Sequence, residues 1–124
     1  MERYQVLLAE DDGALRRLIA VALREAGLKV AQAADGTEAY KILKDNPQPS
    51  ALLISDVRMP GMDGYDLAER AIALNPEIKI LMLTGYSDML IPPAALRARE
   101  VRVLMKPVDL DQLCERAMEM LARP

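Results

Sequence analysis

Five short apolar runs recur along the chain, and a segment with helical spacing follows each of them. The runs have the length of strands and occupy residues 6–8, 29–33, 51–55, 78–83 and 101–104. Three of them lack the polar alternation of a half-exposed strand, which is typical of strands buried on both faces of a parallel sheet. This repeated alternation of strand and helix predicts an α/β fold.

The segments between the runs carry the apolar stripes and end signals of helices. Stripes indicate helices over 15–26, 67–74 and 110–121, and "DGTE" at 35–38 is a capping-box-like start for another that ends before "NPQP". Two prolines leave only a short helix at about 93–99. The residues expected to face the core are Leu15, Leu18, Ile19, Ala22, Leu23, Ala26, Ala39, Tyr40, Ile42, Leu43, Leu67, Ala68, Ala71, Leu74, Leu110, Leu113, Cys114, Ala117 and Leu121.

Several charged residues near the expected helix starts have an ordinary structural interpretation. Asp12, Asp35, Asp63 and Asp109 stand where a helix begins or a turn follows a strand, so we expect N-caps or solvated turn residues. The two arginines at 16–17 fall on an exposed helix face, where we interpret them as solvated charge and assign them no role.

The length and composition fit one ordered domain. The chain has 124 residues, of which 52% are hydrophobic and 28% charged. We therefore expect residues 1–124 to form a single domain in which five βα units build a doubly wound, parallel five-stranded sheet with right-handed crossovers. Ligands of such sheets bind beyond the carboxyl ends of the strands.

Charge and cysteine content exclude several classes of function. A net charge of -3 offers no general attraction to nucleic acid or to an anionic membrane, so we expect neither as a partner. One cysteine and no histidine exclude a disulfide framework and the usual zinc spacings. No apolar stretch reaches the roughly 18 residues of a membrane span, and "MERYQ" is no signal peptide, so a cytoplasmic location is expected.

Chemically active side chains gather at the carboxyl ends of four strands. They lie in "AEDD" (9–12), "SDVRMP" (55–60), "TGYS" (84–87) and "MKPV" (105–108). We expect the carboxylates among them to converge, although two carboxylates about 4 Å apart repel by roughly 4 kcal/mol at an effective dielectric constant of about 20. Three carboxylates and one lysine leave a charge that one Mg²⁺ would balance, and oxygen ligands suit this ion.

A lysine and a threonine at the same edge point to a phosphoryl group. Neither Lys106 nor Thr84 assists the coordination of Mg²⁺, but an ammonium and a hydroxyl group both bind phosphoryl oxygens. A carboxylate can attack a phosphorylated donor and form an acyl phosphate, with cations stabilising the transferring oxygens. We therefore expect Asp56 to be an exposed carboxylate that accepts a phosphoryl group.

The motifs "EDD", "DVRMPGMDG", "TG" and "KP" occur in this order on a predicted (βα)₅ chain. The chain thereby resembles the receiver domains of bacterial two-component response regulators, the CheY-like family. The resemblance spans essentially the whole chain. It implies a flavodoxin-like strand order of 2-1-3-4-5, a stand-alone Mg²⁺-dependent phosphoryl acceptor, and a switch that catalyses only its own phosphorylation and dephosphorylation.

The resemblance also assigns the metal site position by position. Asp56 matches the phosphoacceptor, and it contributes to Mg²⁺ binding. Asp11 matches a direct metal ligand, whereas Glu10 acts more through water. The backbone carbonyl of Arg58 takes the place of the third protein ligand, and Asp12 falls outside the site.

The remaining family positions concern the phosphoryl group and the switch. Thr84 matches the switch hydroxyl, and Lys106 matches the lysine that pairs with the phosphoryl group and precedes a commonly cis Pro107. The chain departs from the family at Val103, where an aromatic residue is usual. Because of this departure, we expect residues 86–93 to carry the switch instead.

The resemblance further implies two kinds of protein partner. A sensor histidine kinase or phosphotransfer protein supplies the phosphoryl group, and an effector protein reads the signal. We expect the effector to contact the surface formed by residues 89–100, the fifth strand and the last helix.

Two other functions remain open from the sequence. The first is a phosphorylation-independent interaction module with the receiver fold, which Val103 favours. The second is an aspartyl-phosphate phosphohydrolase of the haloacid dehalogenase type, which needs a second acid where this chain has Arg58. A flavin carrier is disfavoured because the acids after the first strand would repel the flavin phosphate.

Overall fold

The computed structural model describes residues 4–46, 50–85 and 101–122, and it confirms the expected α/β fold. Five parallel strands form one sheet in the order β2-β1-β3-β4-β5, as predicted. The strands are β1 (Val6–Ala9), β2 (Val30–Ala33), β3 (Leu52–Asp56), β4 (Lys79–Thr84) and β5 (Val101–Met105).

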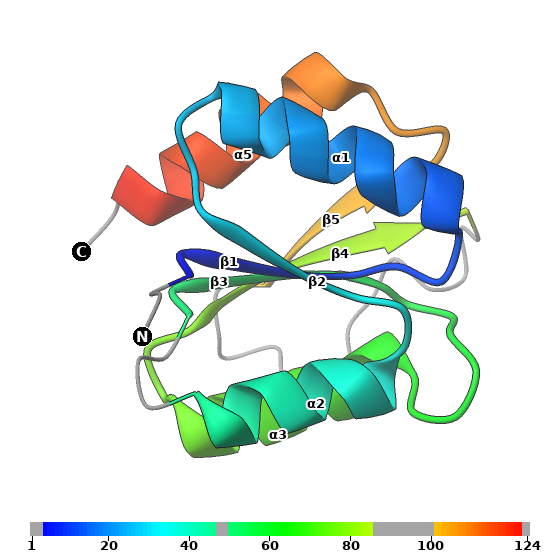
Figure 1. Ribbon diagram of the computed structural model, residues 1–124, viewed down its shortest axis with the longest axis vertical. Helices are drawn as coiled ribbons and strands as arrows, with labels where there is room; N and C mark the ends of the chain where they lie inside the picture. Colours follow the sequence, from blue (N-terminus) through cyan, green and yellow to red (C-terminus); the bar gives the residue numbers. More distant parts are fainter. Residues whose placement is uncertain (1–3, 47–49, 86–100, 123–124) are drawn as a thin grey trace.

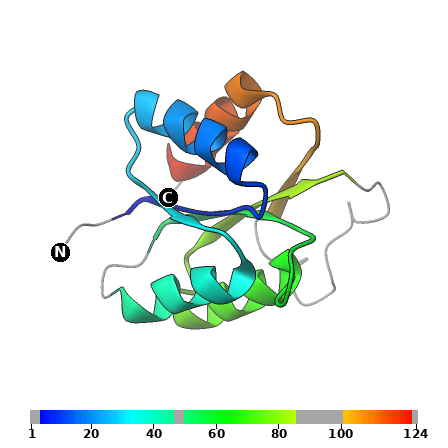
Figure 2. The same ribbon diagram turned by 45° about the vertical axis from the view of Figure 1, so that its right-hand side comes forward.

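Helices cover both faces of this sheet. Figures 1 and 2 show helices both above and below the sheet, so that the described residues form three layers. The helices are α1 (Gly13–Glu25) and α5 (Leu110–Ala122) on one face, and α2 (Gly36–Asp45) and α3 (Gly64–Leu74) on the other. The short helix expected at about 93–99 lies outside the described residues.

Each of these four helices begins with an aspartate cap, as the sequence predicted. Asp12 accepts hydrogen bonds from the backbone of α1, Asp35 from that of α2, and Asp63 from that of α3. Asp109 accepts one from the backbone N–H of Gln112 at the start of α5. A negatively charged cap at a helix N-terminus also interacts favourably with the helix dipole.

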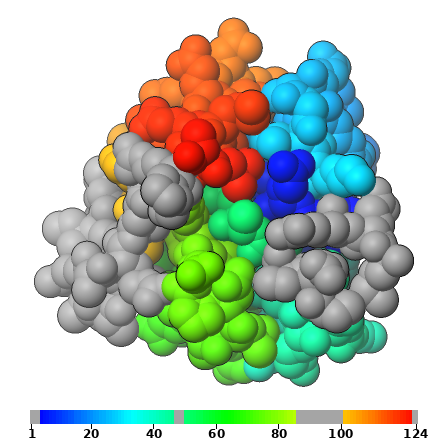
Figure 3. All heavy atoms as spheres, turned by 90° about the vertical axis from the view of Figure 1, so that its left-hand side faces the viewer, coloured from blue at the N-terminus to red at the C-terminus, as the bar shows by residue number. Residues whose placement is uncertain are grey.

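The helices therefore all begin at the carboxyl edge of the sheet and end at the opposite edge. Figure 3 looks onto that opposite end of the molecule, with α5 in red above and α3 in green below. The N-caps and the strand ends thus meet on the side away from this view, where the candidate site lies.

The core is divided by the sheet into two clusters. Along β1, Leu7 and Ala9 contact the α2 and α3 side, whereas Val6 and Leu8 contact the α1 and α5 side, and all four are fully buried. Burial of one leucine side chain stabilises a fold by about 1.5–3 kcal/mol. Apolar residues on both faces of the strand explain why its sequence shows no polar alternation.

The sequence misplaced two leucines and one alanine, since Ala26, directly after α1, is also exposed. Leu18 in α1 is 57% exposed and Leu74 in α3 is 47% exposed, although both were expected in the core. In α1 the buried residues are Ile19, Ala20 and Leu23. Successive residues are about 100° apart around a helix. Because the side of α1 between Ile19 and Ala20 faces the sheet, Leu18 lies about 100° away from Ile19 on the other side and is exposed to solvent.

Two glycines allow the loop between β3 and α3 to pack closely. A Cβ atom on Gly64 would overlap the carbonyl oxygen of Asp56, and one on Gly36 would overlap the carbonyl oxygen of Met62. The loop therefore contacts the end of β3 and the start of α2 through backbone atoms, which positions the residues around Asp56.

We expect Gly64→Ala to lower the free energy of unfolding by about 2 kcal/mol, since the added Cβ requires the backbone to shift. Urea unfolding measures the change. Gly85→Ala is the matched control, because its nearest atom would be Lys106 Cβ at 4.0 Å, an ordinary contact. Equal and small effects of the two substitutions would contradict the close packing at Gly64.

Candidate functional site

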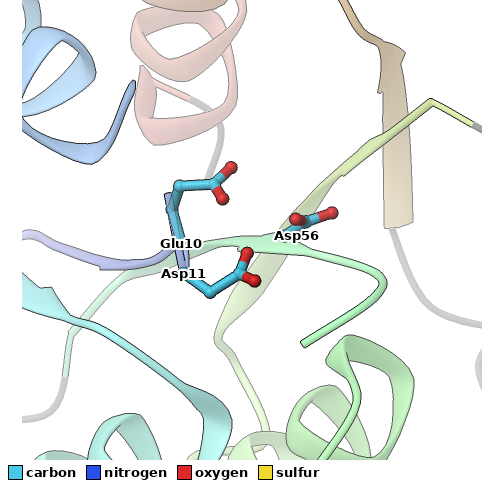
Figure 4. A group of neighbouring side chains, drawn as sticks. All are labelled: Glu10, Asp11 and Asp56. Atoms are coloured by element: carbon cyan, nitrogen blue, oxygen red, sulfur yellow. The ribbon is translucent and has the colours of Figure 1, made fainter. Parts of the chain in front are cut away.

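Three carboxylates from two strands meet at the carboxyl edge of the sheet. Glu10 and Asp11 follow the end of β1, and Asp56 is the last residue of β3. One oxygen of each lies within 4.8 Å of the others, and Figure 4 shows the three side chains gathered beyond the two strands. Clustered carboxylate oxygens are the ligands that Mg²⁺ prefers, so this donor set fits the expected ion.

Asp56 is less exposed than the sequence argument expected. It retains 7% of its accessible surface, so the expectation of an exposed carboxylate is wrong for this structure. The strand continues one residue further than the apolar run, and Asp56 still pairs with Leu83 of β4. Its charge is balanced by Lys106, which covers part of the carboxylate.

Lys106 lies between two of the carboxylates. Its Nζ atom is 3.0 Å from Asp56 Oδ2 and 3.0 Å from Glu10 Oε1. Burial alone would lower the pKa of Lys106, but the bonds and charges of Glu10 and Asp56 outweigh this effect, and the pKa is raised. Lys106 therefore remains positively charged at neutral pH and ties the ends of β1, β3 and β5 together.

Glu10 is fully buried at the end of β1. Burial raises the pKa of its carboxyl group above the ordinary value, and the hydrogen bond from Asp12 and the contact with Lys106 oppose this rise. Oε2 accepts a hydrogen bond from the backbone N–H of Asp12 at 3.0 Å, while Oε1 pairs with Lys106. Oε2 is thus hydrogen-bonded, whereas the buried Oε1 has an ion-pair partner but no hydrogen-bond partner within the described part of the chain.

Thr84 and Arg58 lie around this cluster. Thr84 ends β4, is 1% exposed, and accepts a hydrogen bond at its carbonyl oxygen from the backbone N–H of Lys106 at 2.7 Å. Arg58 is exposed and, together with Asp11, lines a hollow of about 470 Å³ beside the loop after β3. All six residues expected at the site therefore come from the same edge of the sheet.

Arg16 makes a contact that the sequence pattern did not predict. Its Nη1 atom donates a hydrogen bond of 2.9 Å to the carbonyl oxygen of Glu10, so the interpretation of Arg16 as merely solvated charge is wrong. The signal was its position in the first turns of α1, directly after the acidic segment. The spacing of apolar residues along a helix does not show that the long side chain of Arg16 extends back toward β1.

Two further expectations concern the chain around Lys106. The peptide bond between Lys106 and Pro107 is cis, as the resemblance implied. Val103 lies in β5 and packs, partly buried, against the core cluster on the α2 and α3 side. The expected switch at 86–93 lies outside the described residues, as does the 89–100 part of the expected effector surface.

Comparison with known proteins agrees with this geometry. Residues 6–118 match the model of the response regulator receiver domain. The chain belongs to the response regulator receiver family. Within the described residues, this receiver has no helix that is both long and apolar enough to cross a membrane.

Relatives of the receiver differ in length. It is 38% identical over 117 residues to the response regulator receiver protein CpdR of Brucella abortus (strain 2308), and the alignment covers 94% of this chain and 96% of CpdR. It is 34% identical over 112 residues to the C4-dicarboxylate transport transcriptional regulatory protein DctD of Rhizobium meliloti (strain 1021), covering 90% of this chain but only 24% of DctD.

A solved structure is also similar. The crystal structure of the receiver domain from the hybrid histidine kinase CckA aligns with a TM-score of 0.80 and 36% sequence identity, and it covers 94% of this chain and 97% of that chain. The fold, strand order and family of this receiver are thereby established.

We expect Lys106→Met to lower the free energy of unfolding of the metal-free protein by about 2 kcal/mol. Removing one partner of a fully buried ion pair costs about 3–5 kcal/mol, and a quarter of the Lys106 side chain (25%) is exposed. Urea unfolding in a chelator measures the loss, with Lys41→Met on the exposed face of α2 as the control. Equal small losses in both variants would contradict the bridging role.

The contribution of Lys106 should also depend on pH. Its pKa is raised in the folded state above the ordinary value of 10.5, so the folded state holds the proton more tightly. The stabilisation should be complete below 10.5 and lost as the pH rises through the folded-state pKa. The difference in stability between wild type and Lys106→Met should therefore be unchanged from pH 7 to 9.

Proposed function

We propose that this receiver accepts a phosphoryl group on Asp56 in an Mg²⁺-dependent reaction of a two-component phosphorelay. The observation that carries the proposal is the bridge by Lys106 between Asp56 and Glu10, beside Asp11. The bridge holds an ammonium group against the reacting carboxylate, where it can neutralise the oxygens of an incoming phosphoryl group.

In the proposed transfer, an Asp56 carboxylate oxygen attacks the phosphorus atom of a phosphohistidine. A new P–O bond forms, the P–N bond breaks, and its electron pair stays on the imidazole nitrogen of the donor. The product is an acyl phosphate. Lys106 stabilises the charge on the transferred oxygens, and the hydroxyl group of Thr84 donates a hydrogen bond to the product.

The metal would be held by Asp11, Asp56 and the backbone carbonyl of Arg58, with Glu10 acting mainly through water. When bound, Mg²⁺ would supply positive charge to the oxygens of the phosphoryl group and so lower the repulsion that the attacking carboxylate meets. The carboxylate cluster and the shared hollow of Asp11 and Arg58 support this assignment.

Hydrolysis returns the receiver to its resting state. A water molecule attacks the phosphorus atom, the bond to the Asp56 oxygen breaks, and the products are the free carboxylate and inorganic phosphate. The receiver thus acts only on its own phosphoryl group, as a switch and not as a metabolic enzyme.

The proposed partners are proteins. A sensor histidine kinase or a phosphotransfer protein supplies the phosphoryl group, and an unidentified effector protein reads the state of the receiver. Likeness to the receiver of the hybrid histidine kinase CckA, and to CpdR over nearly the whole length of CpdR, supports a receiver that acts through protein contacts. We also propose that it acts in the cytoplasm.

Incubation with acetyl phosphate and Mg²⁺ should add one phosphoryl group, about 80 Da, to the intact mass of the wild type. Asp56→Asn should gain nothing, because an amide is not a nucleophile toward phosphorus. Asp66→Asn, at an exposed position in the first turn of α3, is the matched control and should be modified like the wild type. A chelator should abolish the gain.

Other results would favour a different function. No mass gain under conditions that preserve acyl phosphates would favour a phosphorylation-independent interaction module, with Val103 the first residue to re-examine. Many turnovers of phosphate release from an aryl phosphate would instead favour a phosphohydrolase.

A further inference from the structure

Arg16 bonds to both ends of the acidic segment between β1 and α1. Its Nη1 atom donates a hydrogen bond of 2.9 Å to the carbonyl oxygen of Glu10. Its backbone N–H donates one of 2.8 Å to the carbonyl oxygen of Asp12, in the first turn of α1. The side chain is partly buried, so water competes only in part for these bonds.

Other bonds inside the segment complete a closed turn. The backbone N–H of Asp12 donates to Glu10 Oε2 at 3.0 Å, and the Asp12 side chain caps α1. Asp11 lies between these two residues and is itself exposed. The direction of the Asp11 side chain therefore depends on backbone atoms that Arg16 and the cap hold in place.

We propose that Arg16 is a positioning residue for the metal site, which holds the turn so that Glu10 and Asp11 face Asp56. The inference rests on the proposed function, since it concerns the same carboxylates. A guanidinium group suits the task because its planar donors allow one nitrogen to bind a carbonyl oxygen while the others contact water or neighbouring atoms.

The charge of Arg16 and its hydrogen bond have opposite effects on a bound cation. A positive group near three carboxylates weakens their attraction for Mg²⁺, so removal of the charge alone should tighten binding. Loss of the hydrogen bond should loosen the turn and weaken binding. The sign of the change therefore separates positioning from charge.

The chain offers a matched control one residue away. Arg17 carries the same charge, is exposed, and lies beside Gly13, where an added Cβ would be 3.3 Å from Arg17 Nη1 and 3.6 Å from Arg16 Nη2. The variants Arg16→Gln and Arg17→Gln thus remove equal charge from neighbouring positions, and only the first removes the bond to Glu10.

Titration of the chelator-treated protein with Mg²⁺, followed by calorimetry, tests the proposal. Arg16→Gln should weaken the Mg²⁺ affinity about tenfold, the lower end of the loss seen when an outer partner of a metal ligand is removed. Arg17→Gln should bind Mg²⁺ as tightly as the wild type or more tightly, and Arg16→Lys should recover part of the loss. Equal or tighter binding by Arg16→Gln would overturn the proposal.

A second measurement needs no metal. Amide hydrogen exchange of Asp12 in the metal-free protein should be about tenfold faster in Arg16→Gln than in wild type, while amides in the centre of α5 keep their rates and so exclude global unfolding. If the wild type binds no Mg²⁺, the metal site of the proposed function is wrong, yet this exchange still reports on Arg16. An unchanged Asp12 rate in both Arg16 variants would overturn the proposal.

Discussion

The ion pairs of Lys106 are the interaction on which the carboxyl edge depends. Glu10 directly follows β1 and Asp56 ends the neighbouring strand β3 in the middle of the sheet, and both residues are buried. Two ionised carboxylates at such a place are unfavourable without a nearby cation, because burial removes the water that would otherwise solvate them. A lysine that directly follows the far strand β5 supplies that charge, so the edge forms only when β1, β3, β4 and β5 are in register.

The helix starts contribute to the same balance of charge. Four aspartate caps place the N-termini of α1, α2, α3 and α5 at the carboxyl edge, where the helix dipoles present partial positive charge. The caps neutralise these charges locally and satisfy backbone N–H groups. Asp12 does so within two residues of Glu10, and this proximity explains why the first acidic segment is both a cap and part of the candidate site.

Local patterns in the sequence predicted most of the fold, but they could not predict which way a helix face or a long side chain points. Strands and caps follow from runs and single residues, so they were identified with errors of at most one residue at strand ends. Leu18 was misplaced because periodicity defines a stripe but not which arc the sheet covers. The burial of Asp56 and the contact of Arg16 with Glu10 depend on long side chains from elsewhere, which only the assembled structure brings close.

The backbone contacts at Gly36 and Gly64 also bear on how the chain can vary. At these two positions the loop beside Asp56 lies against main-chain atoms, with no room for a side chain. The outer surfaces of α2 and α3 can therefore change composition without moving the loop, whereas any residue with a Cβ at either glycine displaces it. Substitutions should therefore be well tolerated at the solvent-facing positions of α2 and α3 but poorly tolerated at the first residue of each helix, although these positions lie within one helical turn of each other.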